Sequence, residues 1–368
     1  MTQLEGHVNY KTVPLTAQAI ADLDDQWYDL AAGAVEKNVY FFPWFIQASL
    51  GLYKNKQPTL LSIYYDDLLI GLLTYEDSFG YAKLPIGFYR TALHPHQFTG
   101  TPLIRDGYAQ SFAAGLGLWI DAAPQSRSFC QLLQLNGEEE IVSALEERFT
   151  AEKRAFAFLE RNERAAILTP QGPAQINHSH ISKSRLKSIK RRRKNLEKLG
   201  SVSIETLSKD DDIQIWFDDF LRVENCGWKN ELGTSIQENP ADIEFYREML
   251  GDAQKNNCVN FFRLCLDGKA IAYTLDILSG PFSYCLKCGH DFEYRKYAPG
   301  VLLELETLDY YVSNGEENIV DSCTHFDNTM LNDLWPDRKK IVSLGIAKKQ
   351  IHHKILFNIM SRFNTLIK

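Results

Sequence analysis

The stretch YRKYAPGVLLELETLDYY, from Tyr294 to Tyr311, is the most informative segment of the second half of the chain. Its first part is basic and aromatic, and it leads into the pair Pro299-Gly300. Because the first amides of a helix have no internal partner and the helix dipole is positive there, such a turn suits an anion. The alternative is an ordinary helix start, in which Pro and Gly end a loop. Both interpretations predict a helix after the pair, since apolar residues recur at helical spacing at positions 301, 302, 305 and 308.

Length and composition indicate a globular protein. The chain has 368 residues, of which 45% are hydrophobic and 24% charged, so we expect about two domains. No apolar run reaches the roughly 18–20 residues that cross a bilayer, and the first residues lack the features of a signal peptide. Seven scattered cysteines are an odd count for a disulfide framework and suit a reducing compartment. We therefore predict a cytoplasmic protein that is not transmembrane.

The net charge of −7 hides a strongly basic segment, KSRLKSIKRRRKNLEK at residues 183–198. This segment holds nine Lys and Arg residues against one Glu, and Ser182 before it is a candidate N-cap of a helix. Most helices of this kind are solvated surfaces. The segment can also attract an anionic partner, either transfer RNA or a membrane surface.

Pro and Gly concentrate in TPQGPAQINHS, residues 169–179, which predicts a domain boundary there. We expect an N-terminal domain at 1–175 and a C-terminal domain at 181–368. The second half is predicted to run strand, two helices, three antiparallel strands, helix, strand, helix, strand. This order is typical of an α/β domain with a mixed sheet.

Four segments of the second half carry a resemblance to the GNAT acyltransferase fold. They resemble most the GNAT-like domain of proteins involved in cellulose or exopolysaccharide biosynthesis, often called BioF2-like. Ala298 stands where that family carries Ser in a Ser-Pro-Gly turn. The four segments, in order, are RLKSIKRRRKNLEKLGSV, VENCGWKNELGTSI, CLKCGHDFEYRKYAPGVLLEL and DSCTHFDNTMLNDLWPDR.

The resemblance implies the fold class and the activity. NVYFFPWFIQASL, residues 38–50, and the hairpin after it resemble the first lobe of such proteins. The implied fold is α/β with two tandem GNAT-like lobes, as in the FemABX peptidyltransferases, each a mixed, mostly antiparallel sheet flanked by helices. The implied activity is transfer of an acetyl or acyl group from acyl-coenzyme A to an amine or hydroxyl. The acceptor would be a small molecule or a polymer precursor.

The resemblance also implies a donor site. In GNAT enzymes the fourth strand splays from the fifth, the acyl thioester lies in the gap, and the diphosphate sits on amides of the turn that opens the next helix. Many GNAT domains carry an Asn that contacts the cofactor on the helix after the fifth strand, which Asn328 matches here. The remaining residues of the implied donor site are Arg295, Lys296, Ala298, Pro299, Gly300 and Val301.

Catalysis needs a base for the acceptor and a proton for the departing thiolate. We predict Asp291 as the base, with His290 as its competitor and Glu224 as a further carboxylate near the acceptor. Trp335 stands where many GNAT domains carry a Tyr that protonates the thiolate. An indole N–H cannot do so, and we expect Trp335 in the core. Protonation then comes from Tyr297 or water, or the domain does different chemistry.

The acceptor is predicted to meet Trp228, Lys229 and Asp321. We predict no metal, because CLKC alternates like a strand and would point Cys285 and Cys288 to opposite faces. Two alternatives to an acyl-coenzyme A enzyme stay open. One is a FemABX-like transferase that uses aminoacyl-transfer RNA, which the basic segment favours. The other is an inert GNAT-like protein that binds a polymer, an envelope precursor or a protein partner.

Overall fold

The computed structural model describes residues 7–53, 56–81, 83–169, 172–226, 235–316 and 319–366. The chain divides into two compact units. Unit 1 combines residues 1–162 with 340–368, and unit 2 is residues 163–339. This division differs from the predicted domains, because residues 163–175 join unit 2 and the last residues join unit 1. Among the described helices, none is both long and apolar enough to span a membrane.

Unit 1 is a mixed, mostly antiparallel sheet. Its strands are antiparallel except for β4 and β6, which pair in parallel. The short β5 (Leu103–Ile104) pairs with β3 beside this path. In spatial order the strands are β1 (Val8–Pro14), β2 (Thr59–Tyr65), β3 (Leu68–Tyr81), β4 (Leu84–Thr91), β6 (Arg127–Asn136) and β13 (Asp337–Ala347).

Helices cover this sheet and explain why the C-terminal segment belongs to unit 1. Helix α4 packs on β1 and β2, where Gly115 allows close approach, since a Cβ there would meet Ile63 at 2.4 Å. Phe357 and Met360 of the last helix join an apolar cluster with Phe129 of β6. The helices are α1 (Ala17–Ala21), α2 (Asp24–Ala32), α3 (Pro43–Ser49), α4 (Ala109–Ala122), α5 (Glu140–Ala151) and α12 (Ile351–Leu366), with 3-10 turns η1 (Val39–Phe41) and η2 (Leu50–Tyr53).

Between residues 202 and 334 the elements follow the order that the sequence predicts, but the last predicted strand, β13, belongs to unit 1. The strand order is β7-β12-β11-β10-β9-β8, and all pairs are antiparallel except β11 with β12. The strands are β7 (Phe156–Leu168), β8 (Val202–Thr206), β9 (Val259–Leu266), β10 (Lys269–Ser279), β11 (Phe282–His290) and β12 (Ile319–Asp321). Each unit is thus a mixed sheet flanked by helices, which confirms the predicted fold class.

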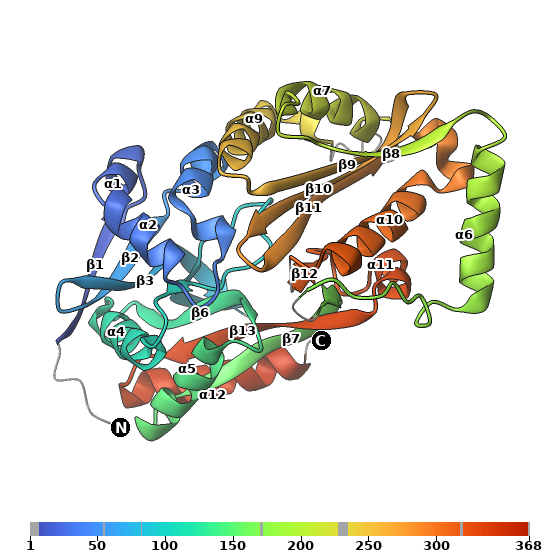
Figure 1. Ribbon diagram of the computed structural model, residues 1–368. Coiled ribbons are helices and arrows are strands. Elements are labelled where there is room, and N and C mark those ends of the chain that lie inside the picture. The colour runs from blue at the N-terminus through green and yellow to red at the C-terminus, as the bar shows by residue number, and fades with distance from the viewer. Residues whose placement is uncertain are drawn as a thin grey trace. The chain divides into compact units, whose positions relative to one another are not determined.

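Helices lie on both faces of the unit 2 sheet (Figure 1). Gly289 of β11 faces α7, because a Cβ there would lie 3.3 Å from Glu224, whereas the next residue, His290, faces the start of α10. Helix α6 packs Ile189 and Leu196 into the same apolar cluster as α10 and α11. The helices are α6 (Lys183–Leu196), α7 (Ile213–Glu224), α9 (Pro240–Lys255), α10 (Pro299–Asn314) and α11 (Thr329–Leu334), with 3-10 turns η3 (Ile236–Glu238) and η4 (Phe292–Tyr297).

Candidate active site

Strands β11 and β12 pair over only three residues. The pairs are Phe282 with Ile319, Ser283 with Val320 and Tyr284 with Asp321. Strand β11 then continues to His290, while β12, its neighbour on that side, ends at Asp321. Residues 285–290 therefore lie beyond the stretch of β11 that pairs with β12. This short pairing is compatible with the splayed fourth and fifth strands that the GNAT resemblance implies.

Helix α10 follows this stretch after the 3-10 turn η4. Ala298 has left-handed backbone angles (φ 51°, ψ 55°), Pro299 is the first helical residue, and no side chain caps the helix. The first intrahelical bond runs from the Leu302 N–H to the Ala298 carbonyl. The amides of Gly300 and Val301 therefore have no partner within the helix and are available to an anion.

Positive charge gathers beside the helix start. The exposed Arg295 guanidinium lies over the Phe292 ring, 4.1 Å from its centroid, and Lys296 Nζ lies 4.9 Å from the centroid of Tyr297. Arg192 of α6 donates a 3.4 Å hydrogen bond to the Lys296 carbonyl. Within the described part of the chain, no carboxylate pairs with Arg295 or Lys296. The residues present thus fit a diphosphate at the start of α10.

His290 is the last residue of β11 and is half-buried. A Cβ built on Gly300 would lie 3.7 Å from His290 Nδ1, an ordinary van der Waals distance. The imidazole therefore lies between the last residue of β11 and the first turn of α10. The structure brings these two predicted site residues together.

Asp291 is buried, and both oxygens of its carboxylate have partners within the protein. Oδ1 accepts the Glu293 N–H at 3.0 Å and so caps η4, while Oδ2 lies 3.4 Å from Lys269 Nζ and 3.9 Å from Arg222 Nη1. Its own N–H donates to the Ile271 carbonyl at 2.9 Å. The two cations come from α7 and β10, and no sequence motif links them to Asp291. This arrangement gives Asp291 a structural role at the site.

Glu224 ends α7 on the opposite face of the sheet from His290. It is 3% exposed, and its Oε2 accepts the Ile236 N–H at 3.0 Å. The carboxylate therefore anchors the backbone at the first residue of η3. Trp228 and Lys229, predicted to meet the acceptor, lie outside the described residues.

Asp321 is fully buried in an ion cluster. Its two oxygens accept hydrogen bonds from Arg164 at 2.6 and 2.8 Å, and Lys339 Nζ lies 3.1 Å away. Burial opposes ionisation, yet the two cations hold the pKa of the Asp321 carboxyl well below its usual range. We therefore assign Asp321 to the core of unit 2 rather than to the acceptor site.

Asn328 and Trp335 flank α11. Asn328 is the N-cap of this helix, since its Oδ1 accepts the Leu331 N–H at 3.1 Å. Trp335 is 2% exposed and belongs to the apolar cluster of unit 2, as the sequence predicts. Its indole Nε1 is buried and has no hydrogen-bond partner among the described residues.

A buried polar network beneath α10 was not predicted. The Tyr311 hydroxyl donates to Asp276 Oδ2 at 2.6 Å and also lies 2.9 Å from the Ser283 hydroxyl. Burial, reinforced by the nearby Asp276 charge, raises the pKa of Glu304 to about 8. The sequence signal was present: a Glu interrupts the apolar stripe of α10 one turn after Gly300.

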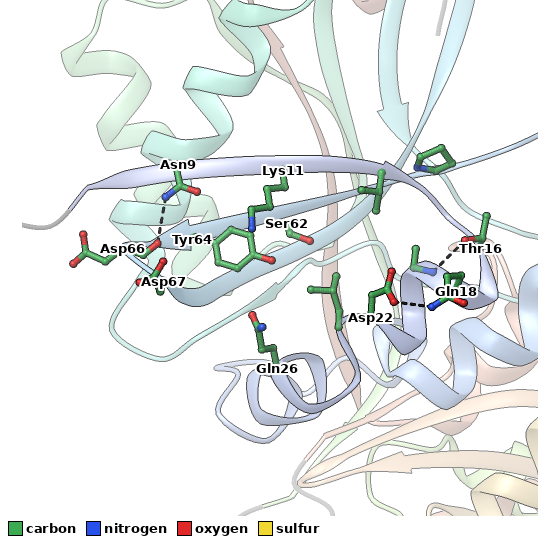
Figure 2. A pocket seen from close by; sticks show the side chains of 14 residues that line it. Asn9, Lys11, Thr16, Gln18, Asp22, Gln26, Ser62, Tyr64, Asp66 and Asp67 are labelled. Atoms are coloured by element: carbon green, nitrogen blue, oxygen red, sulfur yellow. Dashed lines mark hydrogen bonds between the residues drawn. The ribbon is translucent and has the colours of Figure 1, made fainter.

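Unit 1 has a pocket of its own, of about 680 Å³, where β1, β2 and the first helices meet (Figure 2). Lys11 Nζ lies 5.0 Å from the centroid of the buried Tyr64 ring. Burial raises the pKa of the Tyr64 hydroxyl. Three carboxylates, Asp22, Asp66 and Asp67, also line the pocket. Because charges of both signs are present on an open surface, this pocket points to no single class of ligand.

Comparisons with known proteins agree with this geometry. Residues 183–324 match the family model of the acetyltransferase (GNAT) domain. The structure resembles the C-terminal domain of a protein assigned as a lysylphosphatidylglycerol synthetase from Agrobacterium fabrum, with TM-score 0.55, 10% identity and coverage of 93% of this chain and 96% of that chain. It also resembles FemX, with TM-score 0.54, 9% identity and coverage of 95% and 100%.

A conserved protein of unknown function from Bacteroides thetaiotaomicron has TM-score 0.51, 12% identity and coverage of 92% of this chain and 99% of that chain. No curated protein matches the sequence. At such low identity these structures share the fold alone. The predicted resemblance to GNAT and FemABX proteins is confirmed, and the closer likeness to BioF2-like proteins stays a prediction.

Proposed function

We propose that unit 2 transfers an acyl group from acyl-coenzyme A to an amine or hydroxyl acceptor. The observation that carries this proposal is the short β11–β12 pairing, together with the helix start of α10, which no side chain caps. The GNAT family match over residues 183–324 supports it independently. The part of β11 beyond its pairing with β12 would receive the thioester, and the start of α10 the diphosphate.

In the proposed reaction the acceptor attacks the thioester carbonyl carbon, the C–S bond breaks, and coenzyme A leaves as a thiolate. A base takes the proton of the acceptor, and the thiolate gains a proton from the Tyr297 hydroxyl or from water. We assign the base to His290 rather than Asp291. Histidine is the side chain that ordinarily titrates near neutral pH, and His290 lies on the part of β11 beyond its pairing with β12. Asp291 would hold the backbone beside it.

The donor site is tested by calorimetric titration with coenzyme A and acetyl-coenzyme A. We expect micromolar binding, about −8 kcal/mol, to the wild-type protein. Gly300→Asp places a negative charge where the diphosphate would lie and should abolish it. The fold should persist, because an acidic residue in the first helical turn is favourable.

Gly300→Ala is the matched control. Its Cβ meets only ordinary contacts, so it should bind coenzyme A nearly as the wild type does. No binding to the wild type at millimolar ligand would remove acyl-coenzyme A as the donor. Binding without release of free thiol, over a panel of amines and alcohols, would favour an inert binding protein.

A second candidate is transfer from aminoacyl-transfer RNA. The likeness to FemX is compatible with it, and the exposed side of α6 carries Lys183, Lys187 and Lys190, for which the described residues provide no carboxylate partner. Saturable binding of charged transfer RNA, weakened by Lys187→Ala with Lys190→Ala and absent for coenzyme A, would establish this donor instead. Either donor is consistent with a cytoplasmic location, which we also propose.

A further inference from the structure

Unit 2 contains a second polar pocket, of about 520 Å³, away from the start of α10. Its wall combines the first residues of α6, including Ser182 and Arg185, with Trp335 and Arg338 after α11. Arg192, which contacts η4 beside the proposed donor site, follows Arg185 by two helical turns, about 10 Å. The pocket is therefore distinct from the proposed donor site, and its occupancy does not depend on the proposed function.

Trp335 presents an unsatisfied donor in this wall. The side chain is 2% exposed, and its Nε1 has no hydrogen-bond partner among the described residues. An indole N–H only donates, so the missing partner must be an acceptor. A buried donor without a partner costs free energy that a ligand oxygen would recover.

Two guanidinium groups line the same pocket. Arg338 is fixed by hydrogen bonds to the carbonyls of Asn332, Trp335 and Asp337, at 2.7, 3.1 and 2.6 Å. Arg185 Nε is buried without a hydrogen-bond partner, and within the described chain no carboxylate pairs with the Arg185 side chain. Asp333 is the one carboxylate among the described lining residues. The wall therefore carries a net positive charge.

The start of α6 adds backbone donors. This helix has 14 residues, and Ser182 caps it by accepting the Arg185 N–H at 3.2 Å. The amides of Lys183 and Ser184 have no partner within the helix, and the helix dipole is positive at this end. Helix start, indole donor and guanidinium groups all favour the same chemistry, an oxyanion.

Asn332, in contrast to these donors, presents an unsatisfied hydrogen-bond acceptor. Its Nδ2 donates to the Phe326 carbonyl at 2.8 Å, which fixes the amide orientation, and its buried Oδ1 has no partner among the described residues. This acceptor needs a donor such as a ligand hydroxyl. A phosphodiester carries no such donor, whereas a ligand that combines a phosphate with sugar hydroxyls satisfies both requirements.

We propose that this pocket binds a phosphate ester that also carries hydroxyl groups. The phosphate lies at the start of α6, against Arg185 and the Trp335 N–H, and a ligand hydroxyl donates to Asn332 Oδ1. Such a group occurs in free sugar phosphates and in the ribose-phosphate backbone of RNA, which share this chemistry.

The test is calorimetric titration of the full chain with ribose 5-phosphate, with ribose as the ligand control. Trp335→Phe keeps an aromatic ring but removes the indole N–H. Arg185→Gln removes the positive charge of the guanidinium group. Each should weaken the binding of ribose 5-phosphate at least about 10-fold, as expected for loss of a charge-assisted or buried hydrogen bond. Lys194→Gln, an exposed cation of the same helix outside the pocket wall, should change it less than about threefold.

The source of the phosphate is identified by a second titration, with a short single-stranded RNA. Tighter binding of the RNA than of ribose 5-phosphate, lost in Arg185→Gln and Trp335→Phe, assigns the pocket to a nucleotide chain. Binding of ribose 5-phosphate alone assigns it to a small molecule. Gly300→Asp should leave either result unchanged, which separates this site from the proposed donor site.

Two results overturn the proposal. One is no saturable binding of either probe to the wild-type protein at millimolar concentration. The other is binding that Lys194→Gln weakens as much as Arg185→Gln does, which would be unspecific attraction to the basic helix. If Trp335→Phe does not fold, Arg185→Gln carries the test, because no described hydrogen bond of the fold depends on the Arg185 side chain.

Discussion

Thr274 Oγ1 of β10 donates a 3.1 Å hydrogen bond to Glu304 Oε1 of α10, and both side chains are buried. Burial and the neighbouring Asp276 raise the pKa of Glu304 to about 8, so this carboxyl keeps its proton at neutral pH. It joins the helix that begins at the proposed donor site to the central strand as an uncharged group. The helix that begins at the proposed donor site is thus anchored by a hydrogen bond, between Thr274 and Glu304, that is sensitive to pH.

Glu304→Gln should flatten the dependence of stability on pH. Between the unfolded pKa near 4.3 and the folded value of about 8, the folded wild type binds more protons than the unfolded chain. Its free energy of unfolding should therefore fall as pH rises, by at most about 1.4 kcal/mol per pH unit. Urea unfolding from pH 6 to 9 measures this. Glu306→Gln, on the exposed side of α10 and paired with Arg193, should retain the wild-type slope. Parallel curves for wild type and Glu304→Gln would contradict the prediction.

Asp321→Asn should destabilise unit 2 by roughly 3–5 kcal/mol at pH 7, because it leaves Arg164 and Lys339 buried without a countercharge. The pKa of Asp321 is depressed, so its contribution is complete above the unfolded value near 3.9 and is lost as pH falls through the lower folded value. Acid titration of the unfolding midpoint should show this loss in the wild type only. Asp327→Asn, an exposed carboxylate, should stay within about 0.5 kcal/mol of wild type.

Gly289→Ala should destabilise the protein by about 1–3 kcal/mol, as overpacking does. Its Cβ would lie 3.3 Å from both the backbone and the Cβ of Glu224, so the end of β11 must move away from α7. Thermal unfolding together with titration of coenzyme A measures both consequences. Gly300→Ala, with ordinary contacts, should change neither. An equally stable Gly289→Ala protein would show that the contact between β11 and α7 yields easily.

His290→Gln and Asp291→Asn should have different effects. If His290 is the base, its substitution should lower kcat by about 10²–10⁴ with little change in coenzyme A affinity. Asp291→Asn should mainly lower stability, by about 1–3 kcal/mol, because it weakens the η4 cap and the contacts with Lys269 and Arg222. Rates of thiol release and urea unfolding measure the two effects. A loss of kcat in a stable Asp291→Asn protein, with an active His290→Gln, would move the base to Asp291.

Local signals account for what the sequence predicted. Pro299 begins α10 because proline lacks the N–H that the first turn leaves unpaired in any case. Alternation of apolar residues predicts β11, and Ser182 caps α6 as its side chain suggests. The order of elements in unit 2 follows from such features, since each depends on neighbours a few residues away.

Partners distant in the sequence account for what could not be predicted. Asp321 and Asp291 have the residue type and position expected of reactive carboxylates, but the fold supplies cations to both. Arg164 is 157 residues from Asp321, and Lys269 is 22 residues from Asp291. Neither pair has fixed spacing or a motif. A sequence pattern therefore identifies a carboxylate near a site, whereas tertiary packing decides whether its oxygens are available.

Residues 340–368 belong to unit 1, whereas unit 2 is built from the uninterrupted stretch 163–339. During synthesis on the ribosome, all of unit 2 therefore emerges before unit 1 is complete. Until β13 arrives, β6 lacks its antiparallel partner and presents an open strand edge, which invites pairing with other chains. Because unit 1 is discontinuous, β13 is synthesised late. Its pairing with β6 is therefore the step that protects the nascent protein from aggregation.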